Sequence, residues 1–252
     1  MTALENLMSR LAAIRDPGLH GSLVRDFLES HEPVELVDVL ASLLARASDE
    51  HYRVLYDSFV DVFVADSVIP IPYHVTQEIY RIAGRRNERA VALMLLDPPP
   101  LRRADGWSGD PDPEILDLTL GERKSFARRL DRDLLARMTR VTEPEVLRIL
   151  LSNPRLTESD VVGIAARRPN TVSALTEVVR RRRWRVASTV RMALVNNPYL
   201  PPRLAVLLVP GLPRQERARL RHTPGLHPLI AEMSASLSPH PGGTSSPDSA
   251  PR

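Results

Sequence analysis

The chain reads Leu150-Leu151-Ser152-Asn153-Pro154-Arg155-Leu156 at a point where an apolar segment with helical spacing meets a proline. The same order returns in Leu194-Val195-Asn196-Asn197-Pro198-Tyr199-Leu200, which keeps the Asn before the proline. A third copy, Leu220-Arg221-His222-Thr223-Pro224-Gly225-Leu226, keeps both Leu residues and the proline but neither Asn. Repetition at intervals of tens of residues is typical of stacked helical units. The pattern therefore indicates an architecture before it indicates any chemistry.

Each copy of this turn stands between a helix stop and a helix start. Pro154 disfavours helical angles at the residue before it, so the preceding helix is expected to end there. Thr157 with Asp160 is expected to open the next helix, because a threonine hydroxyl can accept the hydrogen bond of an orphan backbone N–H. Upstream, Thr142 with Glu145 matches a capping box and is expected to start the first helix of this unit. One unit is thus a helix, a proline turn and a second helix.

The second copy follows the same order with other residues. Its proline stops one helix, and Pro201 with Pro202 is expected to start the next, since proline fits the first helical turn. Between the two copies, Arg168-Pro169 indicates a degenerate unit. Asn153 and Asn197 are expected to satisfy free carbonyl groups at helix ends, although a ridge of turns could also present them as binding groups.

Composition favours an all-α protein. Of the 252 residues, 43% are hydrophobic and only 4% are aromatic, and the apolar positions are mostly Leu, Val, Ala and Ile. Such residues suit packing between helices better than a sheet. Upstream of the repeats, apolar residues at helical spacing predict at least four further helices. These stripes lie at residues 36–44, 55–63, 75–83 and 90–96.

The chain divides into four regions by composition and charge. Residues 1–96 are expected to form an acidic helical region, and residues 97–116, rich in Pro and Gly, a linker. Residues 117–237 are expected to form a basic helical-repeat region, and residues 238–252 a disordered tail. Residues 1–100 carry a formal charge of −6 and residues 101–252 one of +9. The basic half is therefore expected to meet nucleic acid, an acidic protein surface or the amino-terminal half itself.

Residues 118–230 resemble the leucine-rich repeat variant units of the armadillo/HEAT-type α-solenoid superfamily. The resemblance rests on the apolar helix, the Asn-Pro turn, the Leu that follows and the short apolar helix after it. It implies helices stacked into a curved, right-handed superhelix that serves as a binding scaffold, and it implies no catalytic residue. Some variant-repeat proteins bind an iron–sulfur cluster through Cys, but this chain has no Cys, so no such cluster is expected.

The sharpest candidate for a binding surface is a run of basic residues around one tryptophan. Arginine side chains bind phosphates and an aromatic ring can stack on a base, so the run is compatible with nucleic acid. Two other interpretations stay open, a structural role at a helix end with the tryptophan packed between units, and an acidic protein partner. The residues of this candidate surface are Arg167, Arg168, Arg180, Arg181, Arg182, Arg183, Trp184 and Arg185.

No motif predicts catalysis, a cofactor or a metal. Asp110, Asp112 and Glu114 imitate the first ligands of a calcium loop, but Ile115 and Gly121 stand where that loop needs Gly and Glu. The seven His residues show no metal-ligand spacing, and the sequence contains neither a Gly-rich phosphate loop nor a nucleophile elbow. No signal peptide and no membrane span are expected, which makes the cytoplasm the expected compartment.

Two functions are expected from these observations. The first is a non-enzymatic interaction module that binds a protein or peptide on the concave face of a solenoid. The alternative is a nucleic-acid-binding protein akin to HEAT-like DNA-repair glycosylases, with the basic half as its cradle. The orientation of Arg180 to Arg183 separates them. Side chains that line a concave groove would favour nucleic acid, whereas pairing with the acidic half would count against it.

Overall fold

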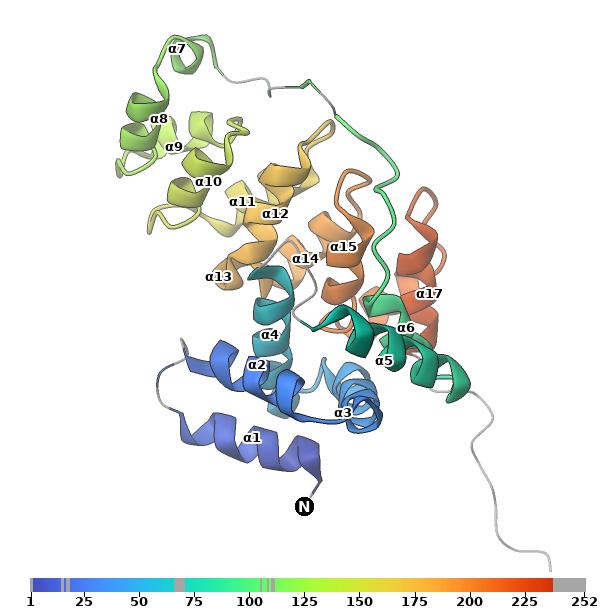
Figure 1. Cartoon of the computed structure of the whole chain (residues 1–252). Coiled ribbons are helices and arrows are strands. Elements are labelled where there is room, and N and C mark those ends of the chain that lie inside the picture. The colour runs from blue at the N-terminus through green and yellow to red at the C-terminus, as the bar shows by residue number, and fades with distance from the viewer. Residues whose placement is uncertain are drawn as a thin grey trace, which may run out of the picture.

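The computed structural model describes residues 2–14, 16, 19–65, 71–104, 106–107, 109 and 112–237, and within these residues the protein is all-α. Seventeen helices follow one another, and no strand occurs in this described part of the chain. Figure 1 shows the first helices gathered at one end of the molecule and the later helices stacked in chain order beside them. The all-α class predicted from the sequence is confirmed. The tail predicted at residues 238–252 lies outside the described residues.

Six helices form the amino-terminal region: α1 (Ala3–Ala13), α2 (His20–Ser30), α3 (Pro33–Arg46), α4 (Glu50–Ala65), α5 (Tyr73–Arg85) and α6 (Arg89–Met94). The four apolar stripes predicted from the sequence lie on α3, α4, α5 and α6, and nearly all of their apolar side chains are buried. A capping box starts α1, in which the Thr2 hydroxyl accepts from the Glu5 backbone N–H and the Glu5 carboxylate accepts from that of Thr2. No described helix is both long and apolar enough to cross a membrane.

The carboxyl end of the predicted linker is a helix. The described residues between 97 and 112 form none, but α7 (Pro113–Leu116) occupies the last four residues of the region 97–116. Its start is local, because the Asp112 side chain accepts a hydrogen bond from the Glu114 N–H and a proline stands in the first helical turn. Asp112 and Glu114, which imitate calcium ligands in the sequence, instead bind Arg137, at 2.8 and 2.6 Å. Asp110 lies outside the described residues.

Ten helices form the repeat region: α8 (Leu120–Phe126), α9 (Arg132–Met138), α10 (Pro144–Leu150), α11 (Glu158–Ala166), α12 (Val172–Arg180), α13 (Arg182–Arg185), α14 (Ser188–Val195), α15 (Pro202–Leu208), α16 (Arg214–Leu220) and α17 (Pro228–Ser236). The proline turns join α10 to α11, α14 to α15 and α16 to α17. Successive units stack, with α10 packed on α8 and α12, α11 on α14, and α15 on α17. The helix α12 and the single turn α13 stand where the sequence indicates a degenerate unit.

Two of the three predicted helix starts in this region are confirmed. Thr157 and Asp160 form the capping box of α11, and Pro201 and Pro202 precede and open α15. The capping box expected at Thr142 is wrong, because α10 begins at Pro144 with Glu143 as its N-cap and no side-chain cap. The fixed φ angle of a proline favours the first helical position, which leaves Thr142 outside the helix.

The two asparagines of the proline turns join neighbouring units. Asn153 is buried and its Nδ2 donates to the carbonyl oxygens of Ala127 and Arg129, at 2.9 and 2.8 Å. Asn197 is buried in the same way, and its Nδ2 donates to Ala165 and Arg167, at 2.7 and 2.9 Å. These acceptors lie at or just after the carboxyl ends of α8 and α11, where carbonyls lack intrahelical partners. The expectation that the asparagines satisfy such carbonyls is confirmed, and the carbonyls belong to an earlier unit of the stack.

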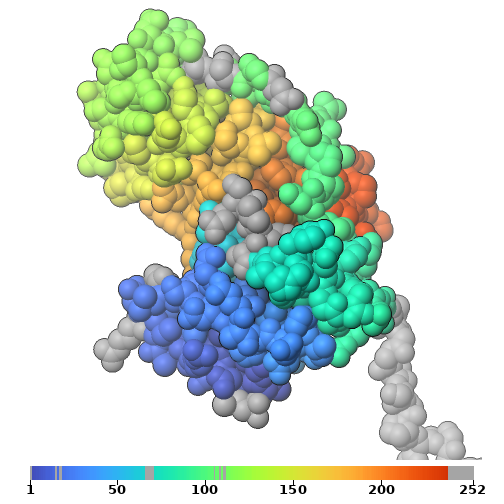
Figure 2. Space-filling model, viewed as in Figure 1, coloured from blue at the N-terminus to red at the C-terminus, as the bar shows by residue number. Residues whose placement is uncertain are grey.

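The two halves of the chain share one core. A contiguous cluster of buried apolar side chains extends from Leu4 in α1 to Met233 in α17. Across the junction, α4 packs on α12, and α6 packs on both α15 and α17. Figure 2 shows the amino-terminal residues, in blue and cyan, in close contact with the orange and red helices of the repeat region. The acidic region is therefore part of the same packed body as the basic one.

Replacing Asn197 with Ala is expected to lower the free energy of unfolding by about 1–3 kcal/mol, because two buried carbonyl groups lose their donors. The matched control is Asn196→Ala, since Asn196 is half-buried and its side chain bonds only within its own helix, to Met192. Urea unfolding followed by circular dichroism measures both. Equal losses for the two variants would contradict the role assigned to Asn197.

A histidine cap makes the last helix sensitive to acid. The Nδ1 atom of His227 accepts the N–H of Leu229 at the start of α17, which requires that nitrogen to be unprotonated. Burial lowers the pKa of His227 from its ordinary value of 6.5. The unfolded chain therefore binds a proton on this histidine more readily than the folded protein does. The stabilisation of α17 by the His227 cap is complete above about pH 6.5, and it is lost as the pH falls through the lower pKa of the folded state.

The variant His227→Asn is expected to lack this contribution to acid sensitivity, because asparagine is a good N-cap that does not titrate. When the pH is lowered from 7 to 5, the free energy of unfolding of the original protein should fall by up to about 1 kcal/mol more than that of the variant. This is the free energy that one N-cap usually contributes to stability. Chemical unfolding at both pH values gives the difference. Parallel pH profiles would refute the histidine cap as a titrating element.

Candidate functional site

The structure places part of the predicted basic surface inside the molecule. Trp184 has only 5% of its surface exposed, and its indole N–H donates to the carbonyl oxygen of Leu151 at 2.7 Å. Arg185 has no exposed surface at all. Neither side chain can meet a partner in this arrangement. The sequence could not reveal this, because a tryptophan within a run of arginines is equally compatible with a stacking site on the surface.

Arg182 and Arg185 bind an aspartate of the acidic half. The Nη1 atom of Arg182 lies 3.0 Å from Asp61 Oδ2, and Nη2 of Arg185 lies 2.5 Å from Asp61 Oδ1. Arg185 also donates to the backbone carbonyls of Val179 and Asp57, at 2.9 and 3.2 Å. Its two terminal nitrogens are thus held by one carboxylate and two carbonyl groups, as a buried charge requires, whereas its buried Nε has no hydrogen-bond partner among the described residues.

A second buried pair lies beside the first. The side chains of Asp57 and Arg191 are each 3% exposed, and the carboxylate Oδ1 accepts from Nη2 at 2.6 Å. Arg191 also donates to the carbonyl oxygens of Arg185 and Gly211, at 2.7 and 2.6 Å. A Cβ atom at position 211 would stand 1.7 Å from Arg191 Nη1, so only glycine allows this approach. Asp57 and Asp61 sit four residues apart on α4, and together they meet three arginines of the repeat region.

Polar contacts from α4 continue along the junction. The Tyr56 hydroxyl is buried and donates to the carbonyl oxygen of Leu207 at 2.5 Å. Burial raises the pKa of Tyr56 well above its ordinary value, which keeps the phenol protonated as a donor. Near the carboxyl end of α4, the carbonyl oxygen of Val64 accepts a hydrogen bond from Nε of Arg180, at 3.2 Å. The acidic half is therefore one partner of the basic run, as one of the sequence interpretations allowed.

The remaining members of the predicted surface are partly or fully exposed, and each donates to a carbonyl group in another unit. Arg167 donates to Thr139, Arg168 to Asn196 and Arg181 to Arg148, at 2.6, 2.6 and 2.8 Å. The guanidinium of Arg183 lies 4.2 Å above the ring of Trp184. Most of these carbonyls are at helix carboxyl ends, where a cation is favourable. These four side chains do not share one groove.

The main candidate for a binding site is a groove of about 1170 Å³ beneath the linker. Its floor follows α12 from Thr171 to Arg180, and one side is formed by the start of α10. Residues 97–100, 103–104 and 106–107 of the linker form the other side. Figure 2 shows this green linker segment crossing the face of the orange helices. Of the predicted surface residues, only Arg180 lines the groove. The groove is built by segments that are distant in sequence, so no local pattern indicates it.

Residues 97–104 of the linker follow an extended path along the repeat face (Figure 1). The backbone N–H of Arg102 donates to the carbonyl oxygen of Pro198 at 3.0 Å, which ties the linker to the second proline turn. Pro98, Pro99 and Pro100 line the groove on one side of this contact, and Trp107 lines it on the other. Three successive prolines favour the extended polyproline conformation and cannot form a helix.

The groove combines positive charge with hydroxyl groups. Glu177 lines the groove and is buried, with 4% of its side chain exposed. Its carboxylate binds both Arg148 and Arg180, at 3.1 and 3.3 Å. The hydrogen bond to Glu177 raises the pKa of Arg148, whose side chain is still 54% exposed. Arg103 adds a further exposed guanidinium from the linker. Such a surface can bind carboxylate groups and backbone carbonyls of a bound chain.

The chain matches no protein-family model, no curated protein and no solved structure. Among the described residues, no group of three or more His, Asp or Glu side chains is placed to hold a metal ion.

Replacing Asp57 with Ala is expected to lower the free energy of unfolding by about 3–5 kcal/mol, because Arg191 would keep a buried charge without its carboxylate. Asp57→Asn, which keeps an acceptor oxygen, should cost less. The control is Asp38→Ala on α3, since Asp38 is 66% exposed and its pair with Arg86 should contribute less than about 1 kcal/mol. Denaturant unfolding ranks the three variants. Similar losses for Asp57→Ala and Asp38→Ala would overturn the structural role of the buried pair.

Proposed function

We propose that this protein is a non-enzymatic helical-repeat scaffold that binds an extended acidic segment of a partner protein. The repeat region would be a right-handed α-solenoid of the armadillo/HEAT kind with units similar to leucine-rich repeat variants. The groove between α12 and the linker would be the site. The single observation that supports this most is the size of that groove together with its exposed arginines, Arg103 and Arg148.

An extended chain suits the shape of the site. The groove runs along α12, and the linker that borders it is itself an extended chain with one backbone hydrogen bond to the repeat face. The surfaces of stacked helical repeats form long binding faces of this kind. Thr171, Ser173 and Thr176 offer hydroxyl groups along the floor, which can bond to the backbone of a bound peptide.

The charge of the groove favours an acidic partner. Glu177 is already bound by two arginines, and the exposed Asp97, the other acid of the lining, lies 3.9 Å from Arg203. These two carboxylates face three arginines of the lining, so the groove keeps a net positive charge. The exposed parts of Arg103 and Arg148 can then pair with carboxylates of a partner, an interaction that is steered over long distances and weakens with salt. Nucleic acid receives less support, because Trp184 and Arg185 are buried and Arg182 pairs with Asp61. Of the basic residues that were predicted to contact phosphates, only Arg180 lines the groove.

Binding of a fluorescent ten-residue peptide that alternates Glu and Pro tests the proposal. Fluorescence anisotropy should show saturable binding to the full chain at 50 mM salt, weaker binding at 200 mM salt, and none for a peptide of alternating Lys and Pro. Arg103→Glu should weaken binding about tenfold. The control Arg219→Glu reverses an exposed arginine of α16, outside the groove, and should leave the affinity nearly unchanged.

Three results would count against this function. They are the absence of Glu-Pro peptide binding at low salt, an equal effect of Arg103→Glu and Arg219→Glu, and tight, salt-dependent binding of a duplex DNA probe that Arg103→Glu does not weaken. The last of these would favour the nucleic-acid alternative instead.

A further inference from the structure

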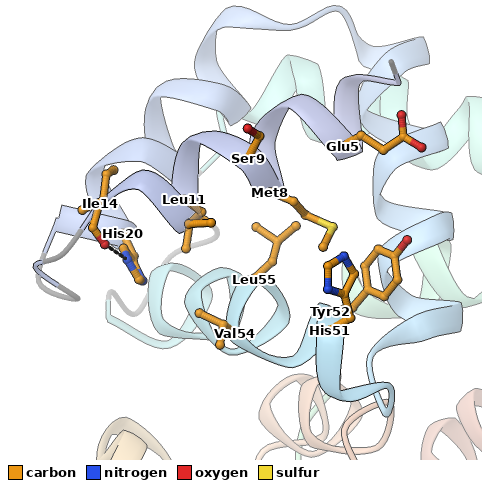
Figure 3. A pocket seen from close by; sticks show the side chains of 11 residues that line it. Glu5, Met8, Ser9, Leu11, Ile14, His20, His51, Tyr52, Val54 and Leu55 are labelled. Carbon is orange, nitrogen blue, oxygen red and sulfur yellow. Dashed lines mark hydrogen bonds between the residues drawn. The ribbon is translucent and has the colours of Figure 1, made fainter.

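A second cavity lies at the opposite end of the molecule, between α1 and α4. It has a volume of about 590 Å³, which is within the range of small-molecule sites. Its walls are mainly apolar. Figure 3 shows Met8 and Leu11 of α1 facing Leu55 of α4, with His20 at one end of the cavity and His51 and Tyr52 at the other. Polar groups therefore stand at two ends of an apolar channel.

His20 is the unusual residue of this cavity. It is the first residue of α2 and is only 7% exposed. Its Nε2 atom lies 3.3 Å from the carbonyl oxygen of Ile14, drawn as a dashed line in Figure 3. A carbonyl oxygen can only accept, so Nε2 carries the proton and Nδ1 presents a lone pair. This buried Nδ1 has no hydrogen-bond partner among the described residues.

An unpaired buried acceptor is unfavourable. Most buried polar groups in proteins have a partner, and an exception indicates a place for a missing donor. No side chain of the lining supplies one. Leu11, Ile14 and Leu55 carry no polar side-chain atom, and the Ser9 hydroxyl, which also lines the cavity, makes no hydrogen bond to His20. Glu5 lines the far end, but its carboxylate is engaged with the backbone N–H of Thr2, which holds the pKa of Glu5 below its ordinary value. It remains an ionised acceptor rather than a donor.

At the far end of the cavity, the Tyr52 hydroxyl already has a hydrogen-bond partner within the protein. The Tyr52 hydroxyl accepts a hydrogen bond from Arg46 Nη1 at 2.6 Å, and the guanidinium lies 5.1 Å from the centre of the ring. The rings of His51 and Tyr52 meet edge to face, with centroids 5.3 Å apart. This end of the cavity is lined by aromatic surface, and the buried acceptor that lacks a donor is at the His20 end.

We propose that this cavity binds a small apolar molecule with a terminal hydroxyl group, which donates its hydrogen bond to Nδ1 of His20. The apolar body lies between α1 and α4, against Met8, Leu11 and Leu55. The site is separate from the peptide groove, since no described residue lines both. The ligand class is defined by the two requirements of the cavity, apolar contact along the walls and one donor at one end.

A matched pair of probes separates the hydroxyl from the apolar body. The molecules 1-octanol and 1-methoxyheptane have the same composition, but only the alcohol can donate a hydrogen bond. Full-length protein labelled with ¹³C in its methionine methyl groups reports the binding site directly. We expect 1-octanol to shift the Met8 resonance and to leave those of Met138 and Met233, which are buried in the repeat region, in place. The ether should bind about tenfold more weakly, because Nδ1 stays unpaired.

Two variants sharpen the test. His20→Leu removes the acceptor, so the alcohol and the ether should bind with equal affinity. Ala12→Trp places a large ring into the cavity from an exposed position on α1 and should abolish the Met8 shift with both probes. If His20→Leu does not fold, the comparison of the two probes in the unmodified protein and in Ala12→Trp still decides. Unchanged Met138 and Met233 resonances show that a variant is folded.

The proposal is overturned by any of three results. The first is a Met8 resonance that neither probe moves. The second is equal affinity for alcohol and ether in the unmodified protein, which would leave an apolar cavity without a role for His20. The third is an unchanged preference for the alcohol in His20→Leu. Each result is independent of whether the Glu-Pro peptide binds.

Discussion

The carboxylate of Asp57 is buried against Arg191, and the arrangement of the two halves depends on this contact. Loss of either partner would leave a buried charge without its counter-ion, which is very unfavourable, so the packing of α4 against the repeat region requires both side chains. Asp61 binds Arg182 and Arg185 one turn further along the same helix. Together these pairs join a region of net charge −6 to one of +9. Much of the basic run thereby becomes an internal feature of the protein.

A second constraint acts within the repeat region, where side chains satisfy the carbonyl groups of neighbouring units. Asn153 and Asn197 do this from the proline turns, and Arg167 and Arg168 do it from the carboxyl end of α11. Each contact fixes how one unit stacks on another. The residues that look most like binding groups in the sequence thus hold the stack together, and the groove under the linker takes its shape from the stacking that results.

Helix positions were largely predictable because their signals are local. The apolar stripes of α3 to α6 and the capping box of α11 depend on residues within one or two turns. The prediction at Thr142 failed where two local signals competed and Pro144 took the first helical position. The candidate site was less predictable. Arg180 lines the groove, but Arg103 and Trp107 come from a linker whose path over α12 has no local signal.

The sequence by itself determined the all-α class, the positions of the proline turns and the residues that stop and start several helices of the repeat region. Only the tertiary structure decided which arginines are buried, where the groove lies and that His20 faces a cavity. The reason is the range of the interactions. A helix stop is set by an adjacent proline, whereas the burial of Arg185 depends on Asp57 and Asp61, more than a hundred residues away in the chain. A charge and its partner at such a distance leave no periodic pattern, so they become visible only when the helices are packed.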